Sequence, residues 1–137
     1  MYNKFRGALH INGCGNSVLT QITFEFDGIQ FLVESGDTYL APYHTLSIGL
    51  GGYEDRMVEI KGIGINNETI VCYVDENNKD AFLQTCLHTP NIDRLSIETI
   101  IRKDRTARFL QFCLDWGITI LSLFGGIIAF ILYFVFM

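Results

Sequence analysis

The sequence lacks the motifs that identify the common classes of enzyme. It has no G-x-S-x-G pattern of a serine hydrolase, no P-loop ending in Gly-Lys-Ser/Thr, and no H-x-x-x-H pair for zinc. His10, His44 and His88 lie far apart, with no Cys or acid at ligand spacing beside them. We therefore expect a non-catalytic protein that uses no metal and no cofactor.

Two local patterns look like sites but have simpler explanations. Gly49-Leu50-Gly51-Gly52-Tyr53 is similar to a phosphate loop, but no helix follows whose amides would bind the anion, so we predict a sharp turn. The acid pairs Glu54-Asp55 and Asp75-Glu76 could serve general acid/base chemistry. Both pairs fall in predicted turns without an evident partner, which is typical of solvated loop charges.

Cysteine is scarce and irregularly spaced. The four cysteines stand at positions 14, 72, 86 and 113, without a C-x-x-C pair. We expect them to be reduced and mostly buried, as in cytosolic proteins. Asn67-Glu68-Thr69 fits the N-glycosylation pattern, which only an exported eukaryotic domain could use, and we interpret it as a chance match.

Charge is absent from the last 21 residues, Gly117 to Met137, of which 16 are apolar. At about 1.5 Å per residue, a helix of this length matches a hydrocarbon core about 30 Å thick. The segment therefore predicts a transmembrane helix, with Trp116 at its proximal boundary. Since no residue follows Met137, we expect a single-pass, tail-anchored protein.

Basic residues are few in the rest of the chain. Residues 1–101 carry 6 basic and 13 acidic side chains, a balance that disfavours nucleic acid as a partner. The basic residues that follow, Arg102, Lys103, Arg105 and Arg108, are typical of the cytoplasmic flank of a membrane span. We expect a cytoplasmic N-terminal domain anchored in the plasma membrane, the inner membrane of a bacterium.

Small residues recur at four-residue spacing within the predicted span. Ser122 pairs with Gly126, and Gly125 pairs with Ala129, on nearly the same helix face. This pattern lets two helices approach closely, although membrane helices are rich in small residues in any case. It predicts a membrane-protein partner or a homo-oligomer, besides the lipid bilayer itself.

The N-terminal part reads mostly as short strands separated by turn residues. Asp27-Gly28 predicts a tight hairpin in which Gly28 supplies a positive φ. Consecutive short strands with tight turns indicate an antiparallel meander. The predicted strands are Phe5–Ile11, Val18–Phe26, Ile29–Glu34, Thr38–Ala41, Thr45–Leu50, Arg56–Ile60 and Thr69–Val74.

Helical patterns begin near position 77. Asn77 or Asn78 could cap a first helix that covers the sheet and ends before Pro90. A second pattern starts near Asn91, although residues 95–101 also alternate like a strand. We predict an α+β fold, a small antiparallel β meander or barrel with a covering helix, in an element order that is pleckstrin-homology-like. The predicted parts are a β-rich domain (1–90), a helical juxtamembrane connector (91–115) and a transmembrane helix (116–137).

Several of these segments together resemble a known accessory domain. They are Arg6-Gly7, residues 24–28, residues 46–52, residues 56–60, residues 71–75 and residues 92–95. The chain is similar over nearly its whole length to the N-terminal β-rich domain and membrane helix of bacterial membrane-anchored zinc metallopeptidases. Those proteases carry an H-E-x-x-H zinc helix after the membrane segment, and this chain ends before any such helix. The resemblance implies an accessory part without the protease.

Two functions follow as hypotheses. The first is a membrane-anchored interaction module, an accessory subunit of a membrane complex whose acidic cytosolic domain binds a protein. The second is the accessory part of a split or truncated membrane zinc metallopeptidase. Lipid sensing by the head is a weaker alternative, because its acidic charge would repel anionic headgroups.

Overall fold

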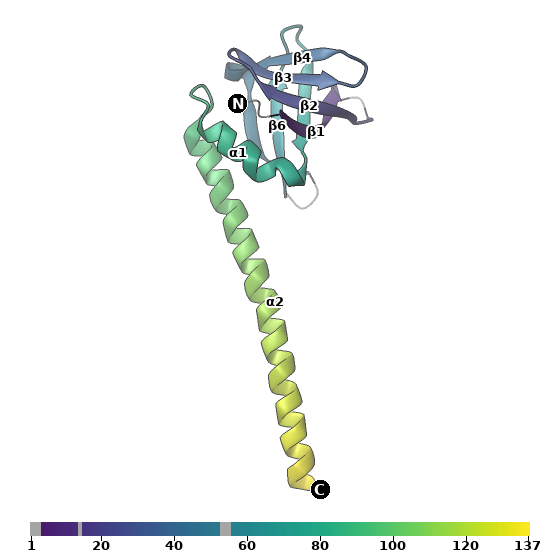
Figure 1. Ribbon diagram of the computed structural model, residues 1–137, viewed down its shortest axis with the longest axis vertical. Coiled ribbons are helices and arrows are strands. Elements are labelled where there is room, and N and C mark those ends of the chain that lie inside the picture. Colours follow the sequence, from purple (N-terminus) through teal and green to yellow (C-terminus); the bar gives the residue numbers. More distant parts are fainter. Residues whose placement is uncertain (1–3, 14, 53–55) are drawn as a thin grey trace. The chain divides into compact units, whose positions relative to one another are not determined.

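The computed structural model describes residues 4–13, 15–52 and 56–137 of the chain (Figure 1). The chain divides into two compact units, one ending at Ile101 and one from Arg102 to Met137. We call the first unit the head. It contains all seven strands, a short helix and the first two turns of the long C-terminal helix.

The strands of the head form one antiparallel sheet in the order β4-β3-β2-β1-β7-β6-β5. Two meanders, β1 to β4 and β5 to β7, are joined where β1 pairs with β7, with Leu9 opposite Cys72. The sheet curls into a half-barrel that is open between β4 and β5 (Figure 1). The strands are β1 (Lys4–Ile11), β2 (Val18–Phe24), β3 (Gly28–Val33), β4 (Thr38–Pro42), β5 (Ser47–Gly51), β6 (Met57–Ile63) and β7 (Thr69–Val74).

This architecture confirms the predicted α+β class and the antiparallel meander. The predicted strands are all present, β7 with the predicted ends and the others with ends shifted by one or more residues. A 3-10 turn over Tyr43–Thr45 delays the start of β5 to Ser47. Gly49 and Gly51 lie within β5, so the turn predicted for residues 49–53 is wrong over this part, and Tyr53 lies outside the described residues.

The hairpin between β2 and β3 exists, but Gly28 has a different role from the one predicted. Glu25 N–H donates to the Gly28 carbonyl, which places the two loop residues at Phe26 and Asp27. Gly28 is not among the glycines with positive φ. A Cβ at this position would clash with the carbonyl of Ala41 on β4, so the glycine permits the close approach of a neighbouring strand.

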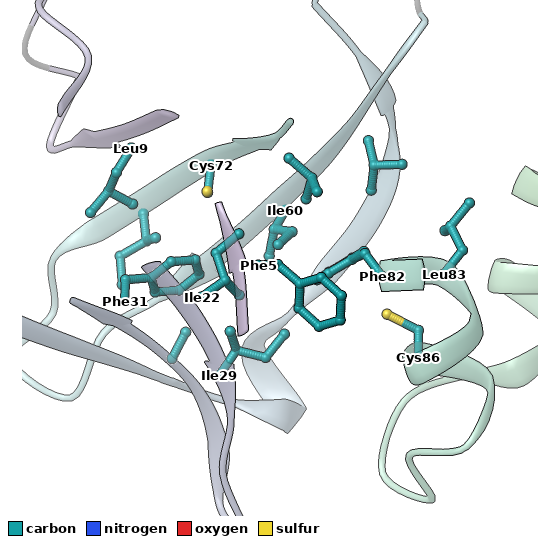
Figure 2. Close-up of a cluster of buried hydrophobic side chains, with 14 of the residues drawn as sticks. Phe5, Leu9, Ile22, Ile29, Phe31, Ile60, Cys72, Phe82, Leu83 and Cys86 are labelled. Atoms are coloured by element: carbon teal, nitrogen blue, oxygen red, sulfur yellow. The ribbon is translucent and has the colours of Figure 1, made fainter. Parts of the chain in front are cut away.

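Helix α1 (Lys79–Leu87) covers one opening of the curled sheet (Figure 1). Figure 2 shows Phe82, Leu83 and Cys86 reaching from this helix toward side chains of the strands. The Phe82 ring contacts those of Phe5 and Phe24, with centroids 5.5 Å and 5.4 Å away. Phe82 is fully buried, so it closes the core from the helix side.

The start of α1 differs from the predicted side-chain cap. Asn78 occupies the N-cap position, yet its side chain makes no capping hydrogen bond to the helix. Its Oδ1 instead accepts from the Arg6 backbone N–H at 2.8 Å. The amide therefore joins the beginning of the helix to β1.

Helix α2 (Arg94–Phe136) runs for 43 residues, which resolves the ambiguity at residues 95–101 in favour of helix. Asp93 caps it, accepting from the Leu95 N–H at 3.2 Å and the Ser96 hydroxyl at 2.7 Å. Ile97 and Ile100 are buried in the head. Burial of one face fixes these first turns as helix, a constraint that alternation in the sequence alone does not reveal.

Replacing Phe82 with Ala is expected to lower the free energy of unfolding by about 3–5 kcal/mol, because it leaves a cavity between α1 and the sheet. The full chain is unfolded with urea in neutral detergent. The unfolded fraction is measured by the maleimide labelling of Cys72, which is buried in the folded head. Phe26→Ala is the matched control, since Phe26 is 96% exposed. A Phe82 variant as stable as this control would contradict the assigned core.

Candidate functional site

The C-terminal part of α2 is apolar and exposed within this chain. Helix α2 contains an 18-residue stretch with a mean hydropathy of 2.5, and none of the residues in this stretch is buried. From Phe109 to Met137 only Asp115 carries a charge. The helix is long and apolar enough to cross a bilayer, and its large side chains, such as Phe124 and Leu121, are exposed.

One face of this apolar helix is polar or small. Its residues recur at intervals of three and four, which keeps them within an arc of about 80° at 100° per residue. Two hydrogen bonds run along the face, from Gln111 Nε2 to Asp115 Oδ1 at 3.1 Å and from the Thr119 hydroxyl to the Asp115 carbonyl at 3.0 Å. We call this set the polar face of α2; it comprises Gln111, Asp115, Thr119, Ser122, Gly126 and Ala129.

Three of the four residues predicted for helix packing belong to this face, and Gly125 lies beside it. A Cβ added at Gly125 or Gly126 would meet nothing within 4 Å, so the helix surface is open there. Sequence reasoning missed Gln111, Asp115 and Thr119. The spacing of three and four residues is the signal that could find them, but Gln111 and Asp115 lie before the uncharged segment, and Thr119 does not belong to a small-residue pair.

The predicted membrane flank lies on the same helix, before its apolar part. Arg102, Lys103, Arg105 and Arg108 are all exposed. Arg108 Nε contacts Asp104 Oδ2 at 3.1 Å, an i,i+4 pair that neutralises part of the cluster. Arg108 precedes Gly117 by about 13 Å along the axis at 1.5 Å per residue, which is more than the roughly 5–8 Å depth of one headgroup layer.

The histidines of the described head lie in separate places. Within residues 4–13, 15–52 and 56–137, no group of three His, Cys, Asp or Glu side chains could hold a metal ion. The His10 ring contacts that of Tyr73 edge-on at 6.0 Å, while His88 Nδ1 lies 2.7 Å from the Gln84 carbonyl. His44 lies in the 3-10 turn before β5.

The acid pairs occupy different settings. Asp75 directly follows β7 and donates its backbone N–H to the Arg6 carbonyl at 2.9 Å, and Glu76 begins the short 3-10 helix that leads into α1. Glu54 and Asp55 lie outside the described residues. A third acid, Glu59, lies on the outer surface of the sheet, where its Oε1 is 3.1 Å from Lys61 Nζ. A hydrogen bond to Glu59 raises the pKa of the Tyr73 hydroxyl.

The cysteines of the described chain are free thiols, as predicted. Cys72 and Cys86 are buried, in line with the expectation that most of the cysteines are, whereas Cys113 is exposed on α2; Cys14 lies outside the described residues. Burial raises the pKa of the Cys72 thiol to about 12, and the nearby Asp75 charge adds to this effect. Burial likewise raises the pKa of Cys86 to about 12. Neither thiol is suited to nucleophilic chemistry.

Comparison of the chain with models of protein families, with curated proteins and with solved structures finds no match.

The raised thiol pKa values predict a loss of head stability at alkaline pH. Well below pH 9 both folded and unfolded thiols are protonated, so these groups make no difference to stability. As the pH rises from 9 toward about 12, the unfolded thiols ionise and the buried ones do not, so the free energy of unfolding falls. Urea midpoints measured across this range should decrease, and Cys86→Ala should make the decrease less steep. An equal slope in the variant would contradict the assignment.

Proposed function

We propose that this protein is a non-catalytic, membrane-anchored interaction module, an accessory subunit of a membrane complex. The observation that carries this proposal is the apolar end of α2, whose large side chains are exposed within the chain. Apolar surface of this extent is unfavourable in water and favourable in a bilayer. The β-rich head then acts at the membrane surface, where it binds a protein.

Charge supports a cytoplasmic head in this proposal. Arg102, Lys103, Arg105 and Arg108 precede the apolar part of α2, and basic residues next to a span favour the cytoplasmic side. The bacterial inner membrane is the location we propose. Protease treatment of inside-out vesicles should remove the head, whereas protection of the head there would contradict this orientation.

The polar face of α2 supports a partner within the membrane. Lipid tails offer no hydrogen bonds, so a hydroxyl inside the predicted span, such as that of Ser122, is better satisfied against another helix. Gly126 and Ala129 on the same face permit close backbone contact. Together they favour a complex in which α2 packs against another span, from a partner or from a second copy.

The second candidate function rests on the resemblance to the accessory domain of membrane zinc metallopeptidases. In this proposal a separate chain supplies the H-E-x-x-H helix, and the present chain positions it at the membrane. A neighbouring reading frame with that motif would support this function. A genomic region without one would count against it.

Lysines placed in the middle of the apolar segment test membrane insertion. Each charge at this depth is expected to cost about 2.5–3.5 kcal/mol of insertion free energy. The double variant Ile127→Lys with Ile128→Lys should become extractable from membranes by alkaline carbonate, while the wild type and Ile127→Leu with Ile128→Leu stay in the pellet. Extraction of the wild type would contradict the proposed anchor.

Gly126→Ile tests the polar face. The branched side chain should block close helix contact and release the partner span without preventing insertion, since isoleucine is itself apolar. Native mass spectrometry of the solubilised protein measures the mass of the assembly. Phe124→Ile, on the opposite face of α2, is the matched control and should leave that mass unchanged. An assembly that survives Gly126→Ile would show that the small residues are incidental.

A further inference from the structure

The head has two sheet edges, and they are protected to different degrees. On β4, Pro42 has no backbone N–H to offer, and the Leu40 carbonyl accepts from the Ile65 N–H at 3.2 Å. Proline and such side contacts are the usual protection of an edge against pairing.

Strand β5 has no comparable protection. It pairs with β6 alone, with Ile48 opposite Ile60 and Leu50 opposite Val58. In an antiparallel ladder the N–H and C=O groups of alternate residues point away from the paired strand. Within the part of the chain that the structure describes, only the β6 ladder supplies hydrogen bonds to the backbone of residues 47–51. These outward groups are free to bind a further strand.

A groove lies beside the start of this edge. Its volume is about 270 Å³, and it is lined by Ser47 and Ile48 on the strand side and by Ile92, Asp93 and Ser96 at the start of α2. All of these residues belong to the head. Ile48 and Ile92 are partly buried against the core, so the groove offers apolar contact next to the open backbone edge.

The charge of the groove is negative. Asp93 is the only charged side chain among the lining residues described. Its two carboxylate oxygens accept hydrogen bonds from the Leu95 N–H and the Ser96 hydroxyl of α2. The surrounding residues 1–101 carry 13 acidic against 6 basic side chains. A segment bound here is therefore favoured by Lys or Arg and disfavoured by acidic side chains.

We infer that the β5 edge and its groove form a strand-addition site for an extended, basic segment of the protein partner. Main-chain hydrogen bonds to β5 would extend the sheet by one strand, an apolar side chain would enter the groove, and a neighbouring basic side chain would face Asp93. This inference rests on the proposed function, since it names the surface through which the head acts as an interaction module.

A defined probe tests the site without the natural partner. The probe is a fluorescein-labelled nonapeptide of alternating Lys and Val, titrated into the full-length protein in neutral detergent and followed by fluorescence anisotropy. Two matched peptides are compared with it, one with N-methylated amides at alternate positions and one with Glu in place of Lys. We expect both to bind at least about tenfold more weakly. The N-methylated peptide lacks the backbone N–H donors that would pair with β5, and the Glu peptide carries the opposite charge.

Variants locate the bound peptide. Asp93→Asn keeps the oxygen that caps α2 but removes the charge. It should weaken binding of the basic probe by about three- to fivefold. Asp37→Asn removes an exposed acid before β4 and should leave the affinity unchanged. Hydrogen exchange of residues 47–51 should slow when the probe is bound.

Equal binding of the N-methylated peptide, or protection that appears away from β5, would overturn the inference. Protection of β5 that grows with protein concentration in the absence of any peptide would also overturn it, since a second copy would then occupy the edge. These outcomes concern the head surface alone. Failure of the proposed function would instead appear as a chain without a membrane partner, whatever the probe does.

Discussion

The pairing of β1 with β7 is the contact on which the head depends. It joins two meanders that follow one another along the chain, and it places Leu9 and Cys72 on the inner side of one continuous sheet. Gly7 permits this pairing, because a Cβ there would lie 2.7 Å from the Tyr73 carbonyl oxygen. Once the two meanders are joined, the curled sheet has one core, one opening for α1 and two edges.

The same pairing determines which surfaces remain for binding. With β1 and β7 at the centre of the sheet, β4 and β5 become its ends. Pro42 and the Ile65 N–H protect β4, whereas the edge of β5 is open next to the capped start of α2. The apolar part of α2 poses a separate constraint, because its exposed side chains need an apolar environment outside this chain. Strand addition at the head and anchoring by the helix are therefore compatible in one molecule.

Local pattern predicts much of this fold. Alternation and turn residues indicate all seven strands, and the absence of charge after Asp115 indicates the apolar helix. Contacts distant in sequence account for the differences. Gly28 is needed by β4 and not by its own hairpin, and Asn78 hydrogen-bonds to Arg6 across 72 positions and not to its own helix. Neither contact leaves a local signal.

The candidate sites likewise differ in whether local spacing or distant contacts determine them. The small residues of the span and the basic flank are visible in the sequence because they depend on helical spacing alone. The polar face is harder to predict, because Asp115 interrupts the apolar segment although the spacing of three and four residues continues through it. The open edge of β5 is not visible, because strand order depends on the β1–β7 pairing.

The most direct test of the proposed function is purification of the full-length protein from its membrane in mild detergent through a tag at Met1, with quantitative mass spectrometry of whatever accompanies it. The account predicts one or more membrane proteins in constant molar ratio to this chain across preparations. Recovery of the chain only as a lone monomer, under conditions that keep other membrane complexes intact, would contradict it.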